Sequence, residues 1–93
     1  MLRGGPHVYE VKLSRRALRD ADHLPEHAWQ RILEVLRALR ENPRPFGSLK
    51  IVGEERLYRL RVGDYRALYD VDDSAQTVLV LRIQHRREAY RNL

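Results

Sequence analysis

Three arginines at alternating positions are the side chains of this sequence best suited to bind or transform a ligand. They fall in residues 58–66, where apolar and arginine residues alternate up to a Gly-Asp dipeptide and a second strand-like run follows. A two-residue Gly-Asp connection between such runs predicts a β-hairpin in which Arg61 lies opposite Arg66. Because side chains alternate between the faces of a sheet, Arg59, Arg61 and Arg66 then share one face. Arginines directly opposite each other repel, so we expect this face to bind something anionic.

A second basic cluster, residues 84–91, follows the almost wholly apolar run Thr77–Ile83. Continuous apolarity predicts a strand near the middle of a sheet. Short connections usually join neighbouring strands, so this strand should lie antiparallel to the second strand of the hairpin. Its end then emerges beside the hairpin loop, and we expect His85 and Arg86 to lie near Arg66.

Convergent arginines with a histidine and a tyrosine suit the cleavage of RNA by its own 2′-hydroxyl group. That reaction needs a group that takes the proton, cations for the charge that develops on phosphorus, and an acid for the leaving oxygen. A histidine titrates near ~6.5, so His85 can act as base or acid, whereas arginine stays protonated and stabilises charge. Tyr90 can stack on a base of the RNA. No acidic or histidine cluster has the spacing of metal ligands, so we expect no metal and no other cofactor.

The same residues also have less specific interpretations. An exposed row of arginines on a strand is most often only a solvated face. Taken alone, His85 is typical of a surface or hydrogen-bonded histidine, and Tyr90 of a packing residue. The combination of the two basic clusters is what favours a functional site.

The composition fits a soluble globular protein with a polyanionic partner. The 93 residues fit one domain, 1–93, with 43% hydrophobic and 33% charged residues. The net charge is +5, and sixteen of the eighteen basic side chains are arginine. Arginine suits bidentate phosphate binding, but composition bias or thermal adaptation is the more common cause of such a total count. There is no cysteine, hence no disulfide framework. The longest apolar run, 78–81, cannot span a membrane and the N-terminus has no signal-peptide core, so we expect no membrane partner and a cytoplasmic location.

Several elements are predicted before the hairpin. Residues 8–13 alternate as a strand does, and Ser14 is a plausible N-cap of a short helix to about residue 21, which buries Ala17, Leu18 and Ala21. A longer helix starts at Pro25 and ends at Asn42-Pro43, with Trp29 in the core. Residues 50–56 fit a short extended piece and a turn, and residues 86–93 a short terminal helix.

The predicted fold class is α+β, in the order strand, two N-terminal helices, then a mostly antiparallel sheet (β-α-α-β-β-β) with a short C-terminal helix. The helices should cover one face of the sheet and leave the arginine face partly open. The first strand can pair in parallel with a later one, because the intervening helices permit that connection.

The chain resembles the RelE/ParE superfamily of toxins from bacterial and archaeal toxin–antitoxin pairs. The resemblance runs from about Tyr9 to Tyr90 and includes Leu-Ser-x-x-Ala, Leu-x-x-Asn-Pro and Leu-Lys-Ile-Val-Gly. Its most specific parts are Tyr-Arg-Leu-Arg-Val-Gly-Asp-Tyr-Arg and the terminal His-Arg-Arg-x-x-Tyr. The resemblance implies a RelE-like fold, a small sheet packed on two N-terminal helices with an open concave face.

The resemblance also implies a function. RelE-type toxins cut messenger RNA in the ribosomal A site by metal-independent 2′-hydroxyl attack, which inhibits translation. A cognate antitoxin binds the toxin, and operator DNA is bound only through the complex. The family's site residues match Arg59, Arg61, Arg66, Arg86 and Tyr90, with Lys50 matching a further common position and Arg87 as the substitute for Arg86.

The chain departs from the best-known RelE pattern at the hairpin. Positions that can be lysine there are Arg59 and Arg61 here. Because arginine hardly loses a proton, the base can be Arg61, His85, or neither if the arginines act by electrostatics. Two other functions stay open: a ParE-like toxin that inhibits DNA gyrase without nuclease activity, and an inactive RNA-binding homologue.

Overall fold

A computed structural model of the chain describes residues 8–91, with side chains described for residues 8–88. The elements follow the order predicted for an α+β fold. They are β1 (Glu10–Leu13), α1 (Arg15–Asp22), α2 (Glu26–Ala38), β2 (Leu49–Lys50), β3 (Leu57–Val62), β4 (Tyr65–Asp72), β5 (Thr77–His85) and α3 (Arg86–Arg91). Residues 50–56, predicted as a short extended piece and a turn, overlap the two-residue strand β2 only at Lys50 and include the turn that follows it.

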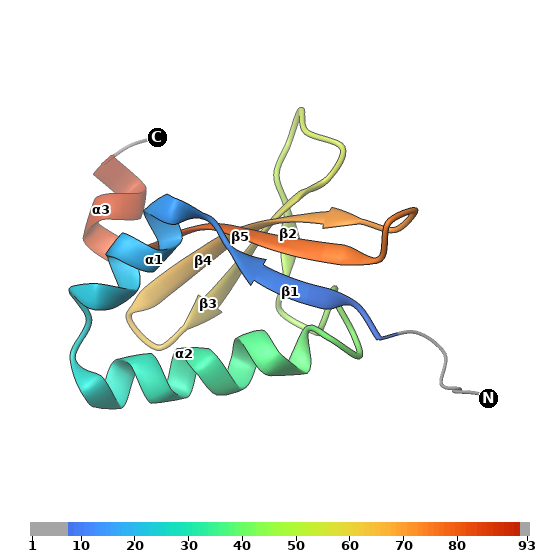
Figure 1. Ribbon diagram of the computed structural model, residues 1–93. Coiled ribbons are helices and arrows are strands. Elements are labelled where there is room, and N and C mark those ends of the chain that lie inside the picture. Colours follow the sequence, from blue (N-terminus) through green and yellow to red (C-terminus); the bar gives the residue numbers. More distant parts are fainter. Residues whose placement is uncertain (1–7, 92–93) are drawn as a thin grey trace.

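The five strands form one sheet in the order β1-β5-β4-β3-β2 (Figure 1). β1 pairs with β5 in parallel and the other pairs are antiparallel, as predicted. The β3–β4 hairpin has the predicted register, in which Arg61 is opposite Arg66 and Val62 is opposite Tyr65. Its first loop residue, Gly63, has φ +59°, a left-handed conformation that glycine adopts without steric cost.

Helix α2 supplies most of the helical part of the core. It lies along one face of the sheet (Figure 1), and its buried side chains recur at the spacing of one helix face. They pack with the inward-facing residues of β3, β4 and β5. The buried core residues are Ala17, Ile32, Leu36, Leu39, Leu60, Val62, Ala67, Tyr69, Val71, Val78, Val80 and Ile83. Trp29 is half-buried and packs against this core from its edge.

Helix α1 closes the edge of β5 beyond the point where β1 ends. The Ser14 hydroxyl accepts a hydrogen bond from the Ala17 amide at 3.1 Å, which confirms the predicted N-cap. The Ser14 amide donates to the carbonyl of Val80 at 2.9 Å, so the helix starts directly against β5. The prediction that Leu18 is buried is wrong, since it is 54% exposed. A two-turn helix at a sheet edge buries a narrow stripe, here centred on Ala17.

The end of the sheet away from the hairpin loop is held by a polar clamp. Asp73 accepts hydrogen bonds from the Tyr9 hydroxyl and from Arg44, both at 2.7 Å. Arg44 also donates to the Tyr58 hydroxyl at 2.9 Å and lies over its ring. The hydrogen bond from Arg44 lowers the pKa of Asp73. These contacts fix the connection after α2, so the charged groups at this end serve the fold.

Helix α3 stands at the other end, beside the hairpin loop. It packs against β4 and β5 and lies on the side of the sheet away from α2 (Figure 1). The predicted terminal helix is thus confirmed from Arg86 to Arg91, while residues 92–93 fall outside the described part of the chain. None of the helices in the described part is long and apolar enough to cross a membrane.

Candidate functional site

Three polar side chains form a row across the neighbouring strands β3, β4 and β5, close to the hairpin loop. Arg61 of β3 is opposite Arg66 of β4, and Arg66 is in turn opposite Gln84 of β5. Residues opposite each other share a face, so the three form one line across three strands. We call these three residues the arginine row. The next line on the same face holds Arg59, Leu68 and Arg82.

The three hairpin arginines differ in their exposure. Arg61 is exposed and its Nε donates to the carbonyl of Gly63 at 3.3 Å. Arg59 is half-buried. Arg66 is only 8% exposed, and its Nη1 donates to the carbonyl of Tyr65 at 3.3 Å. The prediction of an open arginine face therefore needs correction at Arg66, because β4 is the central strand and α3 packs against this strand.

The start of α3 is tied directly to the hairpin loop. The amide of Arg86 donates to the carbonyl of Asp64 at 2.7 Å. Arg86 and Arg87 are both exposed, and the backbone of the turn that carries them lies beside the hairpin loop. The predicted convergence of the two basic clusters is confirmed at the level of the backbone. Tyr90 belongs to α3, and its side chain falls outside the described part of the structure.

His85 does not face the arginine row. It is opposite Tyr65, whose ring packs against the core, and the two rings meet edge to face at 5.4 Å. Its Nδ1 accepts a hydrogen bond from the amide of Arg87 at 3.2 Å, and its own amide donates to Glu88 at 3.3 Å. The expectation that the His85 side chain joins the arginines is therefore wrong. His85 instead caps the first turn of α3.

Gln84 occupies the place in the row that sequence reasoning had left empty. Neighbours on a strand point to opposite faces, so either Gln84 or His85 had to share the arginine face, and the register of β5 against β4 selects Gln84. A glutamine offers both a donor and an acceptor, so it can contact a phosphate or a sugar hydroxyl.

Lys50 also lies outside the arginine row. It is exposed and pairs with Tyr58, whereas its neighbour Leu49 pairs with Arg59. Alternation therefore places Leu49, and not Lys50, on the arginine face. A phosphate-binding role of Lys50 would have to act around the edge of the sheet, because β2 is the edge strand.

Charge pairing divides the arginines of the sheet into two groups. At the clamp end, Arg44 forms an ion pair with Asp73 at 2.7 Å, and Arg56 one with Asp70 at 2.8 Å. At the hairpin-loop end, no carboxylate of the described part forms an ion pair with any of four arginines, which are Arg59, Arg61, Arg86 and Arg87. Guanidinium groups without internal counter-charges can bind a phosphate through two parallel hydrogen bonds. This end of the sheet is therefore suited to an anionic ligand.

Comparison with known proteins extends over nearly the whole chain. A family model described as the ParE toxin of the type II toxin–antitoxin system parDE matches residues 11–90. The toxin RelE of Mycobacterium tuberculosis is 35% identical over 86 residues, which cover 91% of this chain and 89% of that protein. A putative toxin RelE1 of Methanocaldococcus jannaschii is 29% identical over 87 residues, covering 90% of this chain and 97% of that protein.

Solved structures agree with these sequence matches. The chain is similar to one in the crystal structure of an archaeal RelE–RelB complex from Pyrococcus horikoshii, with a TM-score of 0.74 and 30% identity. The match covers 85% of this chain and 96% of that chain. The sheet and helices that carry the arginine row are therefore shared with that chain over most of its length.

Proposed function

The chain belongs to the ParE/RelE toxin family of type II toxin–antitoxin systems, and we propose that it is a ribosome-dependent endoribonuclease that cleaves messenger RNA in the A site. The observation that carries the proposal is the pairing of Arg61 with Arg66 beside α3. A cross-strand pair of like charges is unfavourable until an anion lies between the two. A phosphodiester is such an anion.

The proposed reaction uses the groups of RNA and of this chain, with water as the proton carrier. The 2′-oxygen attacks the adjacent phosphorus, the bond from phosphorus to the 5′-oxygen breaks, and a cyclic phosphate and a 5′-hydroxyl result. Water takes the proton from the 2′-hydroxyl and supplies one to the leaving 5′-oxygen, so the reaction is neutral in protons. Arg61 and Arg66 would stabilise the negative charge that grows on the phosphate, which needs no loss of an arginine proton. Arg86, with Arg87 in its place if the RNA shifts, would bind the phosphate from the side of α3.

The remaining sites have supporting roles in this proposal. Arg59 would bind the phosphate next to the reacting one, and Lys50 a more distant phosphate around the sheet edge. Tyr90 would stack on a base and orient the ribose. The capping contacts of His85 support a positioning role, in which it holds the start of α3 and thereby Arg86. Catalysis would then depend on orientation and charge stabilisation more than on a protein base.

A cognate antitoxin is the proposed protein partner. The similar chain from P. horikoshii is part of a RelE–RelB complex. An acidic, amphipathic antitoxin segment would match the basic end of this sheet and block it. Operator DNA would be bound through that complex, and both proteins would act in the cytoplasm, where ribosomes and messages are found.

Purified protein added to ribosomes stalled on a defined message tests the proposal. Mapping the 5′ ends of the message should give a new end inside the A-site codon. No new end in the presence of ribosomes would overturn the proposal.

A second function is kept because the matching family model is described as a ParE toxin. A ParE-like activity would inhibit supercoiling by DNA gyrase and leave messages intact. A supercoiling assay with the same protein preparation separates the two functions. RNA binding without any cleavage, with unaffected gyrase, would instead indicate an inactive homologue.

A further inference from the structure

A second basic groove runs between α1, the free edge of β5 and the start of α3. It consists of two adjoining hollows of about 410 Å3 and about 240 Å3, which share Asp20, His23 and Arg82 as lining residues. The larger is also lined by Arg16 and Arg19. Among the residues that line this groove, only His85 was part of the site predicted from sequence. We call it the α1 groove.

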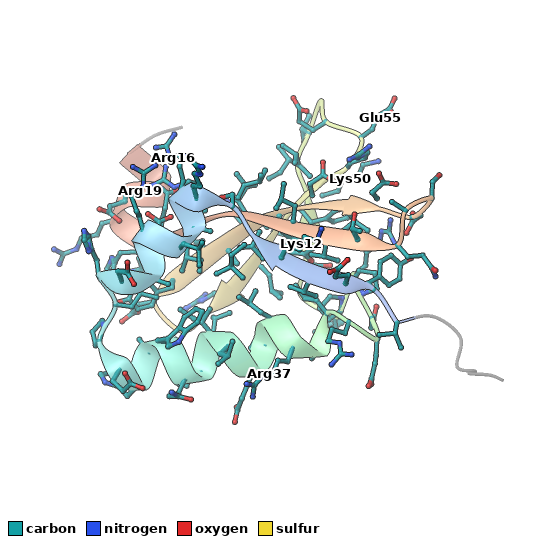
Figure 2. The ribbon with its side chains drawn as sticks, viewed as in Figure 1. Lys12, Arg16, Arg19, Arg37, Lys50 and Glu55 are labelled. Carbon is teal, nitrogen blue, oxygen red and sulfur yellow. The ribbon has the colours of Figure 1, made fainter. Side chains whose placement is uncertain are left out.

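The basic side of the α1 groove is one stripe of helix α1. Arg19 and Asp20 lie three and four residues after Arg16, and His23 lies four and three residues after them, which puts the four residues on one helix face. Figure 2 shows Arg16 and Arg19 projecting from α1 on the side of α3. Both side chains are exposed. No carboxylate among the described side chains forms an ion pair with either of them.

Two acidic residues line the groove: Glu88 accepts a hydrogen bond from the His85 amide, and Asp20 is already neutralised. Asp20 accepts from Arg82 Nε at 2.9 Å, from Arg82 Nη2 at 3.3 Å and from the Ile83 amide at 2.9 Å. Burial alone would raise the pKa of Asp20, but these hydrogen bonds outweigh it and the pKa is lowered. Asp20 thus stays ionised and satisfied, which leaves the charges of Arg16 and Arg19 available to a ligand.

The α1 groove is continuous with the arginine face of the sheet. Arg82 lies on β5 in the line of Arg59 and Leu68, directly beside the arginine row. Its guanidinium reaches from that line to Asp20 of α1. A ligand that leaves the arginine row toward β5 therefore meets the α1 groove next.

We propose that the α1 groove is a second phosphate-binding subsite, which holds the backbone of the same single-stranded RNA beyond the arginine row. The identity of the ligand as RNA rests on the proposed function. Arg16 and Arg19 supply the phosphate contacts, and Arg82 anchors the bottom of the groove through Asp20. Basic side chains that follow the backbone are one of the two means by which proteins bind single-stranded nucleic acids without sequence preference.

The contribution of this subsite is measured by comparing the affinities of the protein for a short and a long RNA. The probes are 2′-O-methyl oligonucleotides of 4 and 12 nucleotides, which lack the attacking hydroxyl, and the affinity is followed by fluorescence anisotropy at several salt concentrations. The test variant is Arg16→Gln with Arg19→Gln. The matched control is Arg37→Gln with Arg40→Gln, which removes the same charge from exposed residues of α2 and the segment after it. Figure 2 shows Arg37 on the opposite side of the molecule from Arg16.

The proposal predicts that the Arg16–Arg19 variant binds the 12-mer on the order of tenfold more weakly. Its salt slope should fall by about 1.4, since each phosphate contact on a single strand contributes about 0.7. The 4-mer should lose less than about twofold, because the arginine row alone accommodates it. Thermal unfolding of both variants checks that they fold.

Three results would overturn the proposal: an equal loss with the Arg37–Arg40 control, an equal loss for both RNA lengths, or unchanged binding of the 12-mer. The ribosome assay separates this inference from the proposed function. Length-dependent RNA binding through Arg16 and Arg19 without A-site cleavage supports the subsite and contradicts the proposed function. A-site cleavage by the original protein, together with unchanged 12-mer binding by the Arg16–Arg19 variant, supports the proposed function and contradicts the subsite.

Discussion

Arg61 and Arg66 are directly opposite each other in the β3–β4 hairpin, one residue pair away from the loop. The pair does not stabilise the hairpin, because two cations face each other. The other face of the hairpin supplies the stability, through the buried pair Leu60–Ala67 and the stacked rings of Tyr58 and Tyr69 at 5.9 Å. The arginine pair is therefore a cost to the fold that an anionic ligand would relieve.

Removing one charge of this pair should separate stability from activity. Arg61→Gln is expected to raise the free energy of unfolding by about 0.2–1 kcal/mol, because the repulsion disappears. The same change should lower message cleavage on ribosomes at least tenfold. Urea unfolding and cleavage rates on one preparation measure both effects. A loss of stability together with activity would mean that Arg61 supports the fold instead.

The hairpin loop depends on the left-handed conformation of Gly63. Gly63→Ala is expected to cost about 1–2 kcal/mol of stability, because a Cβ disfavours φ +59°. An added Cβ would also come within 3.4 Å of Arg31 Nη1, an ordinary contact that contributes little to the cost. Gly63→Asn should cost clearly less, since asparagine tolerates this conformation. Equal costs of the two variants in urea unfolding would point to crowding by Arg31 as the cause.

His85 provides a test that distinguishes positioning from proton transfer. Its Nδ1 caps α3, and asparagine is among the best capping residues. His85→Asn should therefore keep most of the cleavage activity, while His85→Ala should lose up to about thirtyfold through a cap loss of about 0.5–2 kcal/mol. Cleavage rates from pH 5.5 to 8 are the measurement. If both variants lose activity equally and the loss varies with pH over this range, His85 is an acid or a base.

Asp20 links α1 to β5 and should govern part of the acid stability. Its pKa is lowered in the folded protein, so its contribution is complete above the unfolded value near 3.8 and is lost as pH falls through the folded value. Asp20→Asn is expected to cost about 1–3 kcal/mol at pH 7. The difference from the original protein should shrink below about pH 4 in urea unfolding.

Asp22→Asn is the matched control for this prediction, because Asp22 is an exposed carboxylate of the same helix. It should change stability by less than about 0.5 kcal/mol at any pH. Equal effects of both substitutions would show that the net charge of α1, and not the contacts of Asp20, determines stability.

Local sequence signals were sufficient to predict the hairpin. The Gly-Asp loop and strict alternation define the register of β3 against β4, and both signals lie within nine residues. The cap at Ser14 and the apolar face of α2 are equally local. Most of the fold class followed from these signals.

Long-range relations were not predictable in the same way. The register of β5 against β4 includes an irregularity between Leu68 and Tyr69, and this register decides that Gln84, and not His85, joins the arginine row. The burial of Arg66 depends on where α3 packs. The contact of Arg82 with Asp20 joins residues 62 positions apart, and no local pattern indicates it.

The central claim is that the arginine row is the reaction site. It is tested most directly by the rate at which the Arg66→Gln variant cleaves a ribosome-bound message, with the Arg37→Gln variant as the control. We predict a new 5′ end in the A-site codon with the original protein and with Arg37→Gln. With Arg66→Gln the rate should fall on the order of a hundredfold or more, because one preorganised charge of the arginine row is lost. Equal cleavage by Arg66→Gln and Arg37→Gln, or no A-site cleavage by the original protein, would contradict the claim that the arginine row is the reaction site.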